Sequence, residues 1–204
     1  MALLIKKFGG TSVGSIEKIK NIAKHICDSK ENGNDLVIVV SAMGQSTDEL
    51  NALAESITKN PPRRELDMLL STGEQVTMAL LAMAINEYGM PAISMTGSQV
   101  GIITESIHSK ARILDIKTER VKDFIEQGYV VVIAGFQGSS LSHNGSMEIT
   151  TLGRGGSDTS AVALTCALGA DVCEIYTDVP GVLTTDPRIV EEAKLLDQIS
   201  CEEM

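Results

Sequence analysis

A pair of lysines followed at once by glycines is the first feature of this sequence that could do chemistry. It lies in LLIKKFGGTSVGS at residues 3–15, where an apolar run predicts a buried strand and Ser15 predicts the cap of a helix. Gly9, Gly10 and Gly14 permit a tight turn that points backbone N–H groups at an anion. The N-terminus of the following helix adds partial positive charge, so the segment is typical of a phosphate-binding turn.

The segment does not match the P-loop of nucleotide-binding proteins. The Walker A pattern needs a lysine directly after the second glycine of a G-x-x-x-x-G frame. Gly9 and Gly14 have that spacing, but Ser15 follows them, whereas Lys6 and Lys7 precede the glycines. The sequence therefore indicates a phosphate cradle of another lineage, with a lysine at the strand end. An ordinary glycine-rich turn between a strand and a helix is the alternative, which this motif alone does not exclude.

A second glycine-rich loop, TTLGRGGSDTS at residues 150–160, stands before another predicted helix. Its three glycines allow close backbone approach, and Ser157 or Asp158 is predicted to cap the helix. Arg154 lies inside the loop, where its guanidinium suits a bidentate contact with a carboxylate or phosphate. A surface arginine beside an ordinary cap is the alternative, and the presence of two such loops makes it weaker.

A third segment, YTDVPGVLTTDPR at residues 176–188, follows a predicted strand. Its Asp, Pro and Gly residues are turn formers, so a long loop is one interpretation. In the other interpretation, Thr177 and Asp178 contact the ribose or base of a nucleotide, and Arg188 its phosphates.

Glu74 lies in STGEQ at residues 71–75, inside a long helical region. A glutamate flanked by small polar residues could accept hydrogen bonds from an ammonium group. By itself, however, Glu74 is more often a solvated helix residue.

Composition bounds the class of protein. The chain has 204 residues, 43% of them hydrophobic and only 3% aromatic, so aliphatic residues and nine methionines must fill a sizeable core. A net charge of −10 argues against nucleic acid and anionic membranes as partners, although local positive charge can still bind ATP. The four cysteines form no C-x-x-C pair and the three histidines are scattered, which predicts reduced core thiols and no zinc or other metal site. With no apolar run near membrane-spanning length and no signal peptide, we expect a cytoplasmic protein.

The elements that must position these loops alternate between strands and helices, which predicts an α/β fold with a mainly parallel sheet covered on both faces. The clearest buried strands are residues 36–42 and 129–136, and residues 65–88 predict one long helix or a helix pair. Residues 141–149 predict a hairpin around Asn144-Gly145.

At the end of the chain, residues 200–203 (SCEE) match a capping box that opens a helix, yet the chain stops at Met204. We therefore expect a truncated domain, with a frayed natural C-terminus as the alternative.

Together these segments resemble the kinase domain of the aspartokinases, members of the amino acid kinase superfamily, over the whole chain from residue 3. The motifs that carry the resemblance are KFGGTSVGS, VVSAMGQSTDEL, LLSTGEQV, AGFQG, ITTLGRGGSDTSAVAL and EIYTDVPGVLTTDPR. The resemblance implies a three-layer α/β/α sandwich, of the carbamate kinase-like type, in which ATP and aspartate meet at the carboxyl ends of the strands. It also implies that residues 1–204 are a catalytic domain cut short, without the remaining nucleotide lobe and the ACT regulatory domains.

The resemblance further implies roles for individual residues. Lys7 and Asp158 would be catalytic, with Asp158 organising the active-site lysine. Aspartate would be bound by Ser41, Thr47, Glu74 and Arg154, of which Glu74 would hold the amino group and Arg154 a carboxylate. ATP, accompanied by Mg²⁺, would be bound by Lys7, Phe8, Gly9, Gly10, Thr177, Asp178, Leu183 and Arg188. The family commonly has an aromatic residue at the position of Leu183. This chain departs from that pattern, and the departure bears on how the nucleotide packs there.

The implied reaction is ATP-dependent phosphorylation of the aspartate side chain, the first step toward lysine, threonine and methionine. The acceptor carboxylate is already ionised near neutral pH, so no general base is needed, which agrees with the lack of a catalytic histidine pattern. Two alternatives stay open: a related kinase acting on acetylglutamate or a nucleoside monophosphate, and a non-catalytic fragment. The resemblance also implies a homo-oligomer, or assembly with regulatory subunits.

Overall fold

A five-stranded parallel sheet forms the centre of the molecule in the computed structural model, which describes residues 2–141, 145–179, 181–185 and 189–200. Its strands lie in the order β3-β6-β2-β1-β9, and every pair in it is parallel. Their bounds are β1 Leu3–Phe8, β2 Asp35–Val40, β3 Ala92–Met95, β6 Val130–Ala134 and β9 Val172–Tyr176. The order places β1 between β2 and β9, so that the loops after these three strands meet at one edge of the sheet.

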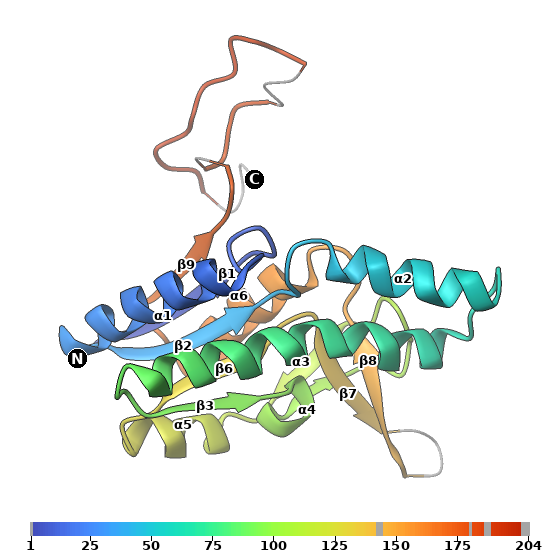
Figure 1. Ribbon diagram of the computed structural model, residues 1–204, viewed down its shortest axis with the longest axis horizontal. Helices are drawn as coiled ribbons and strands as arrows, with labels where there is room; N and C mark the ends of the chain where they lie inside the picture. The colour runs from blue at the N-terminus through green and yellow to red at the C-terminus, as the bar shows by residue number, and fades with distance from the viewer. Residues whose placement is uncertain (1, 142–144, 180, 186–188, 201–204) are drawn as a thin grey trace.

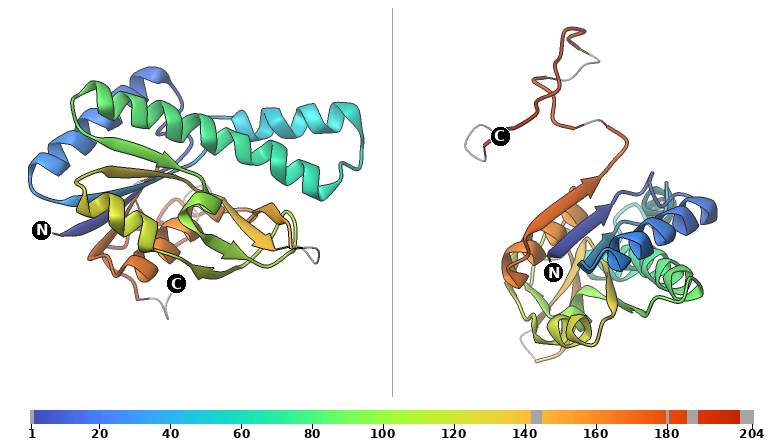
Figure 2. Two further views of the ribbon diagram at one scale, coloured as in Figure 1. Left: turned by 90° about the horizontal axis from the view of Figure 1, so that it is seen from below. Right: turned by 90° about the vertical axis from the view of Figure 1, so that its left-hand side faces the viewer.

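Helices cover both faces of this sheet, as Figures 1 and 2 show. On one face α1 (Ile16–Glu31) and α3 (Arg63–Glu87) pack against alternate residues of the strands, among them Ile38 and Val132. On the other face α4 (Gly97–Val100), α5 (Glu119–Glu126) and α6 (Gly156–Leu168) pack against the residues between, such as Val37 and Val131. The central strands are apolar on both sides because both sides are buried. The predicted α/β/α sandwich is confirmed.

A second, four-stranded sheet was not predicted. It has the order β5-β4-β7-β8 and comprises β4 Ile102–Thr104, β5 Ile113–Ile116, β7 Gln137–Leu141 and β8 Met147–Thr151. Only the β4–β7 pair is parallel. The β7–β8 hairpin confirms the predicted connection, and Gly145 in it has φ +80°; Asn144 lies outside the described residues. Its strand β8 lies beside the N-terminal part of α3 (Figure 2), where Thr151 contacts Asp67, and the loop after β8 leads to α6.

Helix α3 is one continuous helix of 25 residues. By length and apolar composition it is the one helix in the described part of the chain that could cross a membrane, contrary to the expectation that no apolar run approaches that length. Half of its most apolar window is buried inside the molecule, as in the core helix of a globular fold. Its buried face also carries polar residues, namely Asp67, Ser71, Glu74 and Thr77.

Several local predictions are decided by the structure. Ser15 caps α1, because its Oγ accepts a hydrogen bond from the N–H of Lys18 at 3.2 Å. The predicted cap of α6 by Ser157 or Asp158 is wrong: the helix begins at Gly156, and its cap Gly155, in the left-handed region, has no side chain to donate or accept. The prediction of core thiols holds for buried Cys27 and not for exposed Cys166.

The segment after β9 leaves the body of the molecule (Figures 1 and 2). Leu183 in this segment forms an isolated antiparallel bridge with Leu195, so it folds back on itself. The predicted capping box falls on residues 200–203, of which the structure describes Ser200 alone.

Candidate active site

A pocket of about 310 Å³ opens at the carboxyl ends of β1, β2 and β6. It collects seven of the residues that the sequence singled out, from four separate segments: Lys7, Gly10, Ser41, Thr47, Glu74, Arg154 and Asp158. The loop after β1, the start of α2 (Ser46–Ile57), the middle of α3 and the start of α6 form its walls. This is where ligands bind in open parallel sheets.

Lys7 is a buried cation on the floor of the pocket. Its side chain is on the α6 side of β1, and its Nζ lies 2.6 Å from Oδ1 of Asp158 in the first turn of α6. Lys6 points to the opposite face, as strand alternation requires, and its Nζ lies 3.2 Å from Glu174 on β9. Only Lys7 of the two lysines therefore reaches the pocket.

Glu74 is a carboxylate with one unused oxygen. The side chain is 3% exposed, and its Oε1 accepts a hydrogen bond from the N–H of Ala42 at 3.1 Å. Its Oε2 is buried and has no hydrogen-bond partner. Burial raises the pKa of Glu74 to about 7, an effect that the bond from Ala42 only partly offsets. A buried oxygen without a donor, on a pocket wall, is suited to an incoming cationic or N–H group.

Arg154 is exposed on the opposite rim of the pocket, between two glycines in the left-handed region, Gly153 at φ +80° and Gly155 at φ +72°. Among the residues that the structure describes, no carboxylate forms an ion pair with it. The guanidinium is consequently available to an anion in the pocket.

Backbone N–H groups supply further donors to an anion. Those of Gly10 and Thr11 after β1, and those of Ser157 and Asp158 at the N-terminus of α6, donate to no other described group. The N–H of Gly9 is used differently, since it donates to the carbonyl of Tyr176 at 3.1 Å. The expectation that Gly9 presents its amide to an anion is therefore wrong.

The predicted tight turn is present, because the N–H of Ser12 donates to the carbonyl of Gly9 at 2.9 Å, but Gly9, Gly10 and Gly14 form it without positive φ. Gly10 is needed for close approach instead. A Cβ there would lie 2.9 Å from the carbonyl oxygen of Ala42, and Gly44 donates its N–H to the carbonyl of Gly10 at 3.0 Å. The loops after β1 and β2 thus lie backbone against backbone.

A second pocket of about 420 Å³ lies on the other side of the β1–α1 loop. Phe8 and Tyr176 stack there with ring centroids 4.6 Å apart. Thr177 and Asp178 line it as well, so three residues predicted for the nucleotide come together. Leu183 lines neither pocket, and the prediction for Arg188 falls outside the described residues.

Sequence reasoning missed two contributors to these pockets. Lys18 lines the second pocket and donates from Nζ to the carbonyl of Thr11 at 2.8 Å; as one of several lysines on α1 it gave no signal. Phe136 lines the first pocket and has φ +67°, unusual for a bulky residue. Its position in the AGFQG motif was the available signal.

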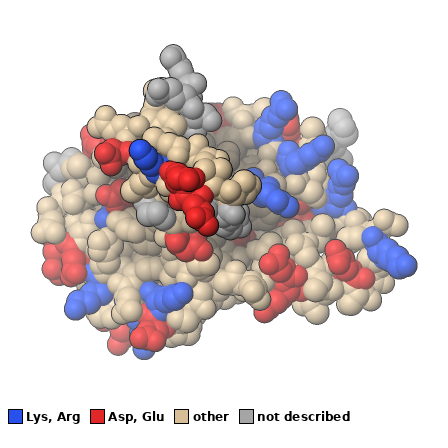
Figure 3. Space-filling view, turned by 90° about the horizontal axis from the view of Figure 1, so that it is seen from above, with Lys and Arg blue, Asp and Glu red and all other residues tan. Residues whose placement is uncertain are grey.

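Of the residues described, the charged ones that line the first pocket are two of each sign, Lys7 and Arg154 with Glu74 and Asp158. Figure 3, which views the molecule from above Figure 1, shows acidic and basic side chains interspersed, with a group of Lys and Arg toward the right of the view. The described residues contain no cluster of three or more His, Cys, Asp or Glu side chains that could hold a metal ion.

Comparison with known proteins points to one family. A model of the amino acid kinase family matches residues 2–204. The chain is 59% identical over 204 residues to the aspartokinase of Bacillus sp. (strain MGA3) and 58% identical to aspartokinase 2 of Bacillus subtilis (strain 168). Each alignment covers 100% of this chain and 49% of the relative, so the chain spans about half the length of the curated relatives it matches.

Solved structures agree. The aspartate kinase from Synechocystis has a TM-score of 0.83 and 57% identity, over 98% of this chain and 32% of that one. Aspartokinase III of E. coli, in complex with aspartate and ADP, has a TM-score of 0.81 and 26% identity, over 96% of this chain and 53% of that one. An isopentenyl phosphate kinase shares the fold, with a TM-score of 0.67 at 20% identity.

Proposed function

Since this chain belongs to the amino acid kinase family, we propose that it is the catalytic part of an aspartate kinase. The reaction transfers the γ-phosphoryl group of ATP to the side-chain carboxylate of L-aspartate and forms 4-phospho-L-aspartate and ADP. One observation carries the proposal: a single pocket holds a cation and free N–H groups on one side and an unpaired buried carboxylate oxygen on the other. That combination suits a phosphate facing an amino acid.

The acceptor side of the pocket is formed by Glu74 and Arg154, together with Ser41 and Thr47, which line the same pocket and can donate from their hydroxyls. Glu74 Oε2 accepts from the α-ammonium of aspartate, and Arg154 binds a carboxylate of the same molecule. An N-acylated acceptor would present one amide N–H in place of an ammonium and leave the Glu74 charge uncompensated. This difference favours aspartate over acetylglutamate.

The donor side is formed by Lys7, the loop after β1 and the N-terminus of α6. ATP extends from there into the second pocket, where Thr177 and Asp178 contact the nucleoside, with Phe8 beneath it and Gly9 and Gly10 near the phosphates. Mg²⁺ would be bound mainly by the phosphates of ATP and by water, with Asp158 as its protein carboxylate, and would supply neutralisation of the phosphate charge. Leu183 and Arg188 belong to the segment after β9, whose part in binding stays a prediction.

The chemistry requires positioning and charge stabilisation more than proton transfer. A carboxylate oxygen of aspartate forms the new bond to the γ-phosphorus while the bond to the β,γ-bridging oxygen breaks, and the electron pair of that bond leaves with ADP. Lys7 stabilises the charge that develops on the transferred group. Asp158 holds the Lys7 ammonium at 2.6 Å and so fixes where that charge lies.

The test is chemical trapping of the product. The chain, and separately a chain extended to the length of its relatives, are incubated with ATP, Mg²⁺, hydroxylamine and one acceptor at a time. Aspartyl hydroxamate formed with aspartate, and with no other acceptor, supports the proposal. Product with a different acceptor overturns the substrate, and product from the extended chain alone shows that residues 1–204 are not sufficient. We also propose that the protein acts in the cytoplasm, in the synthesis of lysine, threonine and methionine. There it would form a homo-oligomer or assemble with regulatory subunits.

A further inference from the structure

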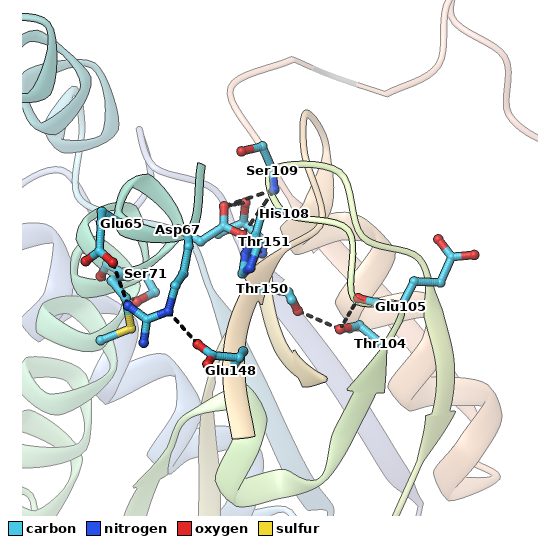
Figure 4. A network of polar contacts seen from close by, with 12 residues as sticks. Glu65, Asp67, Ser71, Thr104, Glu105, His108, Ser109, Glu148, Thr150 and Thr151 are labelled. Carbon is cyan, nitrogen blue, oxygen red and sulfur yellow. Dashed lines mark hydrogen bonds and ion pairs between the residues drawn. The ribbon is translucent and has the colours of Figure 1, made fainter. Parts of the chain in front are cut away.

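A buried carboxylate outside the pocket holds two distant segments of the chain together (Figure 4). Asp67 of α3 is fully buried, and four donor groups surround its oxygens. The ring Nδ1 of His108 lies 2.8 Å from Oδ2, and the N–H of Ser109 lies 3.0 Å from Oδ1. Thr151 donates its hydroxyl at 2.7 Å and its N–H at 3.2 Å. No part of the proposed chemistry uses this group.

The segments that Asp67 joins lead directly to Arg154. Thr151 ends β8, and Gly153 and Arg154 follow it in the chain. The loop that carries His108 pairs with the same place, since Ala111 donates its N–H to the carbonyl of Thr151 at 2.9 Å. Gly153 lies against the loop so closely that a Cβ on it would be 3.3 Å from the carbonyl oxygen of Ser109.

Besides the contacts to Asp67, the loop of Arg154 is held by backbone hydrogen bonds, among them the bond from the N–H of Leu152 to the carbonyl of Phe136 at 2.9 Å. The Arg154 side chain is exposed, and among the described residues it has no ion-pair partner. The position of the guanidinium therefore depends on the backbone between Thr151 and Gly155. Because a displacement of about 1 Å at a binding group can cost a large factor in rate, a loop in this position needs a rigid support.

We propose that Asp67 and His108 are positioning residues that hold the Arg154 loop against the acceptor pocket. The proposal rests on the proposed function, which assigns the acceptor carboxylate to Arg154. In this arrangement Asp67 is the fixed point on the long helix. His108 and Ser109 tie the loop between β4 and β5 to it, and that loop supports Gly153 from outside. Neither Asp67 nor His108 touches the acceptor.

The bond from His108 can be removed without removing its partners. A carboxylate only accepts, so Nδ1 of His108 carries the proton that is shared with Asp67. In His108→Ala this donor is lost, while the N–H groups of Ser109 and Thr151 still satisfy Asp67. In His108→Asn the amide nitrogen stands near the position of Nδ1 and can donate in its place. His108 is partly exposed, whereas substitution of buried Asp67 would endanger folding.

The experiment compares the steady-state kinetics of the hydroxamate reaction between wild type and variants. The variants are made in whichever chain length forms product as wild type. We expect His108→Ala to raise KM for aspartate about tenfold, with kcat and KM for ATP changed less than twofold, and His108→Asn to restore most of the loss. Ser106→Ala is the matched control, because Ser106 lies in the same loop and bonds to Leu141 instead of Asp67. In an Arg154→Ala background, His108→Ala should add almost nothing, since the residue it positions is gone.

Other results contradict the proposal. A lower melting temperature with unchanged KM for aspartate means that His108 is only structural. If His108→Ala raises KM for aspartate and KM for ATP equally, His108 does not act through Arg154. The same conclusion follows if the increases in KM for aspartate caused by His108→Ala and Arg154→Ala multiply in the double variant. If wild type forms no aspartyl hydroxamate in either chain length, the proposed function fails and this inference fails with it. Wild-type activity with an unaffected His108→Ala variant removes this inference alone.

Discussion

Asp67 and Glu74 lie two turns apart on one buried face of α3, yet one carboxylate is fully satisfied and the other is not. Asp67 accepts from four donor groups, whereas Glu74 accepts from Ala42 on one oxygen and leaves the other without a partner. The helix thus presents one anion that stabilises the fold and one that is available for binding. The unfilled bonding capacity of Glu74 distinguishes the two.

We predict that Glu74→Gln makes stability less dependent on pH. The pKa of Glu74 is about 7 in the folded protein against an ordinary 4.5, so the folded state binds its proton more tightly than the unfolded state. Its contribution is therefore full below pH 4.5 and is lost as the pH rises through 7, a change of roughly 3 kcal/mol. Urea unfolding of wild type and variant at pH 5 and pH 7.5 gives the change in the free energy of unfolding between the two pH values, and this change should be smaller in the variant. Parallel pH dependence in the two proteins would refute the shifted pKa.

We predict that Lys7→Ala lowers kcat of the active chain by about 100- to 1,000-fold, with little change in melting temperature. The side chain of Asp158 is 49% exposed, so water can solvate it when its partner is removed. Lys6→Ala is the matched control: it breaks the Glu174 ion pair on the opposite face and should leave kcat within a few fold. Near-normal turnover of Lys7→Ala would show that Lys7 is not the group that stabilises the transferred phosphoryl.

We predict that Gly10→Ala destabilises the protein by about 1–3 kcal/mol, whereas Gly9→Ala costs less than about 1 kcal/mol. A Cβ at position 10 would lie 2.9 Å from a backbone oxygen of Ala42, which cannot rotate away. At position 9 the nearest atom, the oxygen of Tyr176, is at an ordinary 3.5 Å. Denaturant unfolding of the two variants measures the difference. Equal losses would mean that the two loops are not in the close contact described.

We predict that Lys18→Ala raises KM for ATP about fivefold and leaves KM for aspartate unchanged, because Lys18 lines the second pocket and not the first. The effect should diminish as salt is added, since an exposed lysine is screened. Lys24→Ala, an exposed lysine on the same helix, is the control. An effect of Lys18→Ala on aspartate, or an equal effect of Lys24→Ala, would contradict the assignment of the second pocket to the nucleotide.

The sequence predicts the central sheet well because its strands, such as Val37–Val40, are apolar on both faces, a pattern set by burial rather than by partners. It predicts Lys7 and Arg154 as site residues because each stands at an end or break of an element. Glu74 lies in the middle of α3 and was singled out by its small polar neighbours and by the resemblance. The second sheet escapes prediction for the opposite reason. Its strand Gln137–Leu141 is short and carries Gly and Ser, and it is a strand because β4 and β8 lie on either side of it.

Long-range polar contacts are likewise beyond sequence reasoning. Asp67 and Thr151 are 84 positions apart, and no local pattern links them. The close packing around Gly10 was also not predicted, because sequence shows that a residue lacks a side chain but not whether the backbone needs rotation or space. Gly10 needs space, against Ala42 and Gly44.

The bridge between Lys6 and Glu174 has a consequence for assembly of the sheet. The two residues are register partners on the adjacent strands β1 and β9, so their charges mark the correct alignment of these strands. A shift of β1 by one position would turn Lys7 toward α1 and Lys6 toward α6, and in the direction that brings Ile5 opposite Glu174 the ion pair would be lost. In such a misaligned sheet Lys6 would take the place of Lys7 on the α6 face. It would be one residue further from the glycines of the loop after β1 than Lys7 is. The ion pair on the far face thus penalises a folding error whose damage would appear in catalysis.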